Sequence, residues 1–482
     1  MGNTVRKLAV IAVAVFAPYI VAWAASGAAA FAVGTFANTA LSFVLSSVLG
    51  SVLAPKQGGG GAGKVQDSGF LVNKNSNTAA IPIIYGSRRI GGTRVFLEST
   101  DASGNTSGDE YLHIVLAVAQ GGVRGDGTDA VSDITRIIFN DRTAWTSTGG
   151  IDSYYSGNLT VRVWLGKNDQ TTASPDYTSG SFARASEWDS THRMRGVAYV
   201  YVICKYDRDK FPGAPTILVD VAGKRIQSVA SLGTWVDTAA EIQNPANIVY
   251  DYLTSERYGK GLDATDIDLA SFQAARTWAN TAGITINGGV DTADTIFNNL
   301  QALLAGGNLN LVYSNGKYQI LPIKEEDFTG AFTFDESNIL GKWQISLGNK
   351  RGRFNQLKVN YFDPDIDWQP NSLIVENATY LSEDSGVINE KTIELPYASD
   401  TTLATKMGTY FLNLSRYQTQ VNFKASHEAL KLQVGDPVYI THEVPNWTNE
   451  KFRVNSVTLM ADSTVDITLE QYAPDSIYLE NN

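Results

Sequence analysis

The longest run of hydrophobic positions lies near the start of the chain and carries no charged side chain. It extends from Leu8 to Pro55, with Arg6 and Lys7 before it and Lys56 after it. As a helix at about 1.5 Å per residue it would reach roughly 70 Å, more than twice the ~30 Å hydrocarbon core of a bilayer. We therefore expect a membrane or other protein chains to cover this run.

Two interpretations place the run in a membrane. A secretory signal would use residues 8–21 as its apolar core and the Ala-Trp-Ala sequence at 22–24 as its cleavage site, but apolar character resumes from Phe31 to Leu53. A membrane anchor of one or two spans would use Pro18 and Gly27 as a kink or turn.

A third interpretation is a helical bundle formed along an axis by several copies of the chain. Four apolar residues repeat at the 4-3-4 spacing of a coiled-coil seam, while serines gather on the other side of the helix. The seam residues are Leu41, Leu45, Val48 and Val52. We predict that residues 1–56 form a hydrophobic helical segment. It can belong to an axial bundle at one time and penetrate a membrane at another.

A glycine-rich linker and a series of short β strands follow the apolar run. Residues 57–63 read QGGGGAG, which predicts a flexible linker over 57–66. Residues 67–230 contain short apolar or alternating runs punctuated by glycine, which predict a β-rich domain. The predicted strands are Ala80–Gly86, Ile90–Leu97, Tyr111–Val118, Ile134–Asn140, Thr160–Leu165, Val197–Tyr206 and Thr216–Val221.

After these strands the apolar period changes from two to 3.6, which predicts helices. Asn244 followed by Pro245 is typical of a helix start, and a second helix is expected from about Asp266. A third helix follows, and then the Asn-Gly pair within Ser314–Lys317 predicts a β hairpin. We assign residues 231–330 to an α+β insert domain.

The β pattern returns from Phe332 to the end of the chain. One helix, predicted over Thr402–Tyr417, interrupts it, and Phe452–Leu459 and Thr464–Leu469 form a terminal strand pair. We assign residues 331–482 to a C-terminal β-barrel-like domain. The expected fold is therefore mainly β and multi-domain, with an α+β insert and a long hydrophobic N-terminal helical segment.

Composition limits the classes of function. Apolar residues make up 43% of the chain and charged residues 18%, as in globular proteins. The single cysteine, Cys204, excludes an intrachain disulfide, and its apolar strand context favours a buried thiol. A net charge of -11 disfavours tight binding of nucleic acid but suits a wall past which nucleic acid slides.

Few patterns suggest chemistry at a site. Asp363, Asp365 and Asp367 have the spacing of a calcium loop, but Trp368 replaces the glycine of the sharp turn and Ile374 replaces the bidentate glutamate. We therefore favour a solvated acidic loop. The four histidines lack metal-ligand spacing, and neither a nucleophile elbow nor a phosphate-binding glycine loop is present. We expect no enzymatic activity, no cofactor and no metal.

Two adjacent arginines, Arg88 and Arg89, precede the strand that begins near Ile90. Such a pair can bind an anion, but paired arginines ahead of a strand are more often solvated at the surface. We favour the solvated interpretation.

A series of motifs, taken in order along residues 70–475, resembles the central hub protein of the siphophage tail tip, which is related to the tip attachment protein of lambda-like phages. Each motif alone is weak because it is mostly β-turn chemistry; their order carries the resemblance. The motifs are Ile81–Gly86, Gly91–Leu97, Tyr111–Ala117, Trp188–Gly196, Ala198–Val202, Phe211–Pro215, Asn244–Leu253, Arg257–Gly259 and Val434–Val438.

The resemblance implies a structural protein at the tail tip of a virion. It implies a homotrimer of β-barrel-like domains that closes the tail tube, holds the tape-measure protein, and opens so that viral DNA passes without specific binding. Implied partners are the distal tail protein, the tape-measure protein, other tail-tip or fibre proteins and, transiently, the host membrane. Longer members carry further modules after the hub, whereas this sequence ends at Asn482, so receptor binding is expected from another protein.

Two alternatives compete with this interpretation. One is a cell-envelope protein anchored by its N-terminus, whose β domains bind glycan or a partner. The other is an enzyme that degrades an envelope polymer, but no residue pattern in the sequence indicates such an activity.

Overall fold

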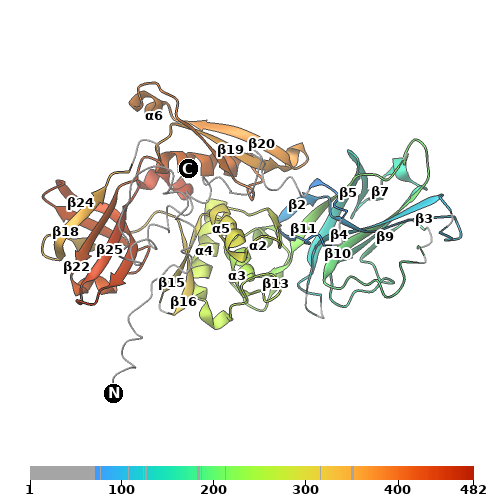
Figure 1. The fold of residues 1–482 in the computed structure, drawn as a ribbon, viewed down its shortest axis with the longest axis horizontal. Helices are drawn as coiled ribbons and strands as arrows, with labels where there is room; N and C mark the ends of the chain where they lie inside the picture. The colour runs from blue at the N-terminus through green and yellow to red at the C-terminus, as the bar shows by residue number, and fades with distance from the viewer. Residues whose placement is uncertain are drawn as a thin grey trace, which may run out of the picture.

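The computed structural model of the chain describes residues 71–481, apart from 76–77, 107, 123, 125–126, 182–184, 186, 212, 315 and 349–351. Within these residues the fold is mainly β, as the sequence predicts, with strands in seven sheets and a few helices. The predicted hydrophobic segment at 1–56 and the linker at 57–66 lie outside the described residues. The parts lie in a row, with a β sandwich at one end, a barrel-like sheet at the other and the helices between them (Figure 1).

The sandwich consists of two five-stranded antiparallel sheets. The first sheet, in spatial order, contains β3 (Thr93–Thr100), β4 (Tyr111–Gln120), β10 (Val197–Lys205), β8 (Leu159–Leu165) and β9 (Tyr177–Ser179). The second contains β2 (Ser87–Ile90), β11 (Ile217–Lys224), β5 (Val131–Phe139), β6 (Arg142–Thr146) and β7 (Gly150–Ile151).

Strand β10 reads as a continuous apolar run because both of its faces are buried. Val200 and Val202 lie in the core between the two sheets. Tyr199 and Tyr201 lie on the other face, where Trp164 and Trp188 pack with them in a second aromatic cluster. A run without alternation therefore still forms a strand here.

The insert surrounds helix α3 (Pro245–Thr254), which is buried over nearly its whole circumference. The Asn244 side chain accepts a hydrogen bond from the Ala246 N–H at 3.0 Å, and Pro245 begins the helix, as predicted. The other elements are α2 (Ala239–Ile242), α4 (Leu269–Ala282), α5 (Ile296–Gly306), and the strand pairs β1 (Ile83–Tyr85) with β14 (Gly288–Val290), β12 (Ile226–Gln227) with β13 (Trp235–Val236), and β15 (Leu309–Ser314) with β16 (Lys317–Pro322).

Helix α4 begins later than the sequence pattern suggests. A short 3-10 turn occupies Ala264–Asp266, and Asp268 then caps α4 by accepting a hydrogen bond from the Ala270 N–H. Asp263 caps the short turn in the same way, so two successive Asx caps divide what the pattern shows as one helix start.

The C-terminal part contains two sheets. A six-stranded, barrel-like sheet has the order β17 (Phe332–Phe334), β23 (Pro437–His442), β24 (Trp447–Leu459), β25 (Val465–Gln471), β22 (Gln420–Ala425) and β18 (Ile339–Ser346). A three-stranded sheet has the order β20 (Gln369–Glu376), β19 (Gln356–Asp363) and β21 (Glu390–Glu394), with α6 (Ala378–Glu383) following β20.

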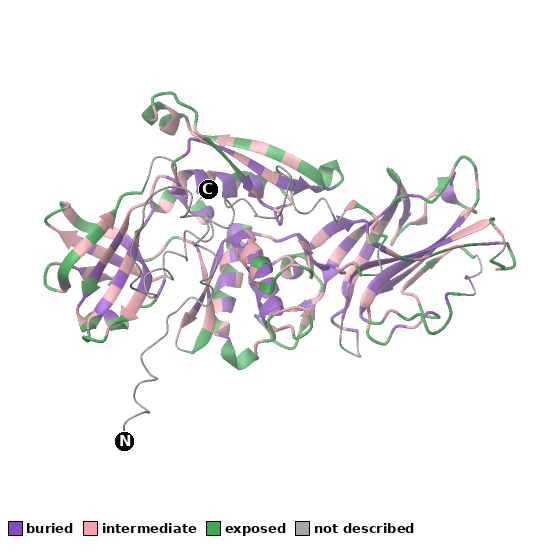
Figure 2. Cartoon of the chain, in the orientation of Figure 1, coloured by how far each residue is buried: buried purple, intermediate pink, exposed green. Residues whose placement is uncertain are grey.

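Helix α7 (Thr401–Leu414) covers the inner face of the three-stranded sheet. It packs Leu403, Met407 and Phe411 against Leu357 and Val359 of β19, where its Gly408 allows close approach. The outer face of β20 is exposed at alternate residues (Figure 2). The predicted helix at 402–417 is thus found, although it ends at Leu414.

Candidate functional site

The predicted site residues Leu41, Leu45, Val48 and Val52 all lie outside the described residues, so the structure does not bring them together. None of the helices between residues 71 and 481 that the structure describes combines the length and hydropathy needed to cross a membrane. The features of interest within the described residues are three joints between parts of the fold and one open pocket.

The first joint contains Arg88 and Arg89, which are at most 2% exposed. The expectation that they are solvated is therefore wrong. Arg89 Nε donates to Asp220 Oδ1 at 2.6 Å and Arg89 Nη1 to Asp367 Oδ1 at 2.7 Å. The Arg88 guanidinium lies 3.7 Å from the ring centre of Phe362. The arginines therefore contact the β19–β20 hairpin, which is far away in the sequence.

The same joint explains the acidic loop at the hairpin tip. Asp363 caps a 3-10 turn through the Asp365 N–H and accepts a second hydrogen bond from Asn371. Asp367 instead pairs with Arg89, and this hydrogen bond is the main cause that lowers its pKa. The carboxylates are thus engaged separately, and the described residues contain no group of three or more metal-ligating side chains. Asp365 and Asp367 are exposed, as the prediction of a solvated acidic loop requires, although Asp367 also makes a specific contact. The prediction is wrong for Asp363, which is buried.

The second joint connects the sandwich with the insert through a buried polar network. Tyr85 and Tyr258 both donate to Asp251 Oδ2 at 2.6 Å. Burial raises the pKa of Asp251 above its ordinary value, although the nearby Lys224 opposes this shift. Lys224 Nζ also lies 3.8 Å from Asp129 Oδ2, with both side chains at most 3% exposed. One buried cation therefore compensates two buried carboxyl groups at this joint.

The third joint lies between the barrel-like sheet and two segments, at residues 324–326 and 472–478. Arg453 donates to the Lys324 carbonyl at 2.9 Å and lies 3.5 Å from Glu326, while Tyr472 and Tyr478 approach its guanidinium. Its cross-strand neighbour is Glu470. Burial raises the pKa of Glu470 to about 7.

We expect this carboxyl group to make the protein less stable as pH rises. The folded-state pKa near 7 exceeds the ~4.3 of an unfolded chain, so the folded state binds more protons between these values and the free energy of unfolding falls as pH increases through that window. In the Glu470→Gln variant the fall in the free energy of unfolding across this pH window should be smaller by up to about 3 kcal/mol. Denaturant unfolding at pH 5 and pH 8 measures it. Glu376→Gln on the exposed face of β20 is the control and should keep the wild-type slope.

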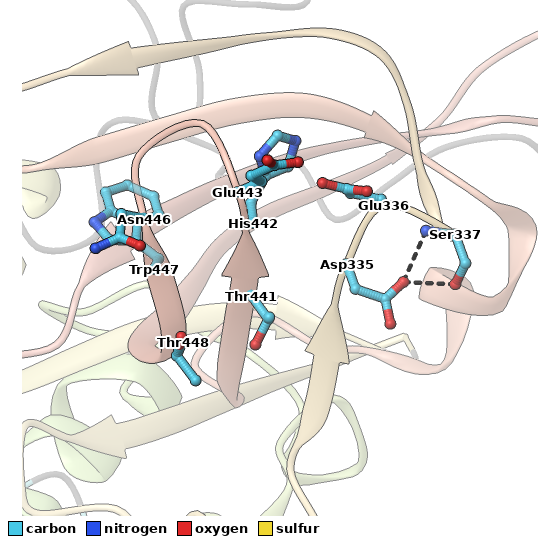
Figure 3. Close-up of a pocket in the computed structure, with 9 residues that line it drawn as sticks. All are labelled: Asp335, Glu336, Ser337, Thr441, His442, Glu443, Asn446, Trp447 and Thr448. Atoms are coloured by element: carbon cyan, nitrogen blue, oxygen red, sulfur yellow. Dashed lines mark hydrogen bonds between the residues drawn. The ribbon is translucent and has the colours of Figure 1, made fainter.

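An open pocket of about 440 Å³ lies at one end of the barrel-like sheet (Figure 3). Asp335 in its wall accepts hydrogen bonds from the Ser337 N–H and hydroxyl, which lower its pKa. The His442 ring stacks on Trp343 at 4.3 Å, and its Nδ1 accepts the Val444 N–H. The lining residues are Asp335, Glu336, Ser337, Thr441, His442, Glu443, Asn446, Trp447 and Thr448. This arrangement suits contact with a positively charged group.

Buried titratable residues elsewhere have structural roles. His113 in β4 is hydrogen bonded to the hydroxyls of Thr100 and Tyr201, each at 2.9 Å, and burial lowers its pKa to about 4. Cys204 lies buried in β10, as predicted, and burial raises the pKa of its thiol. The imidazole is therefore neutral and the sulfur is a thiol at neutral pH, so neither is poised for nucleophilic chemistry.

Comparisons with known proteins define the class of fold. Residues 297–457 match the family described as "Putative phage tail protein". The structure superposes on a chain of "Virion of native gene transfer agent (GTA) particle" with a TM-score of 0.62 at 14% sequence identity, covering 91% of this chain and 93% of that chain. The protein therefore has a β-rich fold of the phage-tail type.

A particular relative is "Baseplate hub protein pb3" of Escherichia phage T5. It is 24% identical over an alignment that covers 84% of this chain, and this chain spans 49% of the relative's length. These findings confirm the resemblance to phage tail hub proteins drawn from the sequence motifs. The matched family and this relative are phage tail and baseplate proteins, in agreement with the predicted virion tail location and structural role.

Proposed function

We propose that the chain is the central hub of a siphophage tail tip, which closes the tail tube and opens for DNA ejection. The alignment with a baseplate hub protein over most of the chain carries this proposal. The fold adds support, because β domains joined in a row through buried contacts suit a wall segment of a ring. The division into domains at 67–230, 231–330 and 331–482 stays a prediction within the proposal.

The proposed assembly is a homotrimer around the tail axis. A closed ring requires rotational symmetry, and three copies bring three apolar N-terminal segments to one axis. Proposed partners are the distal tail protein, the tape-measure protein and other tail-tip or fibre proteins, with transient contact with the host membrane. The net charge of -11 fits a lumen through which DNA moves without binding.

The expected solution state is a trimer, or a chain that trimerises as its concentration rises. Light scattering on the full chain in detergent, and on a variant lacking residues 1–63 in buffer, measures the mass. The shorter variant is expected to be soluble. A strict monomer or dimer at every concentration, with no ring in electron micrographs, would argue against the hub.

A further inference from the structure

The inference starts from the sheet that contains β2. Cross-strand pairing places Arg89 and Arg136 on either side of Asp220, which lies on β11 between them. Arg89 Nε lies 2.6 Å from Asp220 Oδ1, and Arg136 Nε lies 2.7 Å from Asp220 Oδ2. Two guanidinium groups thus share one carboxylate, which leaves an uncompensated positive charge on this face of the sheet.

Residues of the hairpin tip compensate that charge. Asp367, 278 positions further along the chain, accepts hydrogen bonds from Arg89 Nη1 at both its carboxylate and its backbone carbonyl. Its side chain is 71% exposed, whereas that of Arg89 is 3% exposed. The ion pair therefore has one buried partner and one partner that water can resolvate.

The tip also contacts the opposite face of β2. Adjacent strand residues point to opposite faces, so Arg88 lies on the side away from Arg89. Its guanidinium stacks over Phe362 at 3.7 Å and lies 5.3 Å from the Trp368 ring centre. Because β2 is the edge strand of its sheet, the tip can grip it from both sides. We name these contacts of Arg88 and Arg89 with Phe362, Asp367 and Trp368 the clasp.

The backbone of the tip is shaped for this grip. Asp367 and Trp368 both have positive φ, 62° and 61°, which side-chain-bearing residues rarely adopt. This conformation directs the buried Trp368 to one face of β2 and Asp367 to the other. Strained backbone of this kind persists where surrounding contacts hold it, and here those contacts include the clasp.

We propose that the clasp is a releasable latch between the sandwich and the C-terminal three-stranded sheet. Its release frees a carboxylate that is already solvated and leaves Arg89 paired with Asp220. It also exposes the side chains of Arg88, Phe362 and Trp368, which the clasp buries. Opening the joint between sandwich and insert would instead separate the buried Lys224 of the sandwich from the buried Asp251 of the insert. The clasp, which has one partner already in water, therefore opens before that joint, and the hairpin tip leaves β2 while the three-stranded sheet stays packed on the insert. Its use in opening the hub rests on the proposed function.

Distance measurements between spin labels on the full chain test the latch. Thr148→Cys on the β6–β7 turn and Ser372→Cys on β20 place labels at exposed positions on either side, while the buried Cys204 stays unlabelled. Labelled chain is diluted with unlabelled chain so that distances within one molecule are read. Asp367→Asn combined with Trp368→Ala removes both halves of the grip. Asp365→Asn, an exposed neighbour outside the clasp, is the matched control.

The unsubstituted chain and the Asp365→Asn control are expected to give one narrow distance distribution. The double variant should at least double the population at longer distance, and 1 M salt should move the unsubstituted chain in the same direction because it screens the ion pair. The measurement in 1 M salt needs no substitution, so it still tests the latch if the double variant fails to fold. Unchanged distances in both arms overturn the latch. Failure to trimerise would count against the hub and leave the latch intact.

Discussion

Virions carrying Leu45→Asp together with Val48→Asp are expected to lose infectivity by several orders of magnitude while the β domains stay folded. In the proposed bundle both side chains face the other copies, and each buried carboxylate without a partner costs several kcal/mol. Three copies carry six such groups, which the bundle cannot accommodate. Plaque counts on the natural host, together with circular dichroism of the purified variant, measure the two effects.

The control for this experiment uses the other side of the same segment. Ser46→Asp together with Ser47→Asp adds the same charge outside the seam, so infectivity should fall far less. Virions with both seam aspartates that assemble, eject DNA and infect normally would refute the seam at Leu41, Leu45, Val48 and Val52. Its proposed storage in the tip and later insertion into the host envelope would fall with it.

The second large effect is expected at the joint between sandwich and insert. Lys224→Met removes a buried cation near both Asp129 and Asp251, so two buried carboxyl groups lose part of their compensation. Removal of one partner from a buried ion pair typically costs about 3–5 kcal/mol. We expect a loss of that size in the free energy of unfolding at pH 7, measured with denaturant.

An exposed pair of the same type is the control. Lys424 lies 3.1 Å from Asp462, with side chains 45% and 55% exposed. Lys424→Met should cost at most about 1 kcal/mol because water already screens the pair. Adding Asp251→Asn to Lys224→Met should recover part of the loss. A Lys224→Met variant as stable as the control variant would show that Lys224 does not stabilise this joint.

Local patterns in the sequence predict most elements of the fold. Pro245 and the Asn244 cap define α3, and the two-residue loop of the β15–β16 hairpin has the predicted register, with Ser314 opposite Lys317. The helix near 402 follows from its apolar period alone. These signals act within a few residues, which is why they can be read without the tertiary structure.

Contacts between distant segments could not be predicted in the same way. The sequence suggests that Arg88 and Arg89 are solvated because the residues they contact lie more than 270 positions later. These residues are Phe362 and Asp367. The Asp363–Asp367 loop reads as a failed calcium loop for the same reason. The sequence does contain a weak signal of these contacts. Two adjacent arginines in a short strand, and a tryptophan where a calcium loop needs glycine, are both unusual for their local structure. Such exceptions often mark specific contacts.

The most direct test of the hub is a cryo-electron microscopy reconstruction of the tail tip of virions that carry this chain. The account predicts three copies in a ring that closes the tube, a neutral or acidic lumen, and apolar N-terminal segments packed along the axis. A chain found outside the tube axis, or a lumen lined by arginine and lysine, would contradict it.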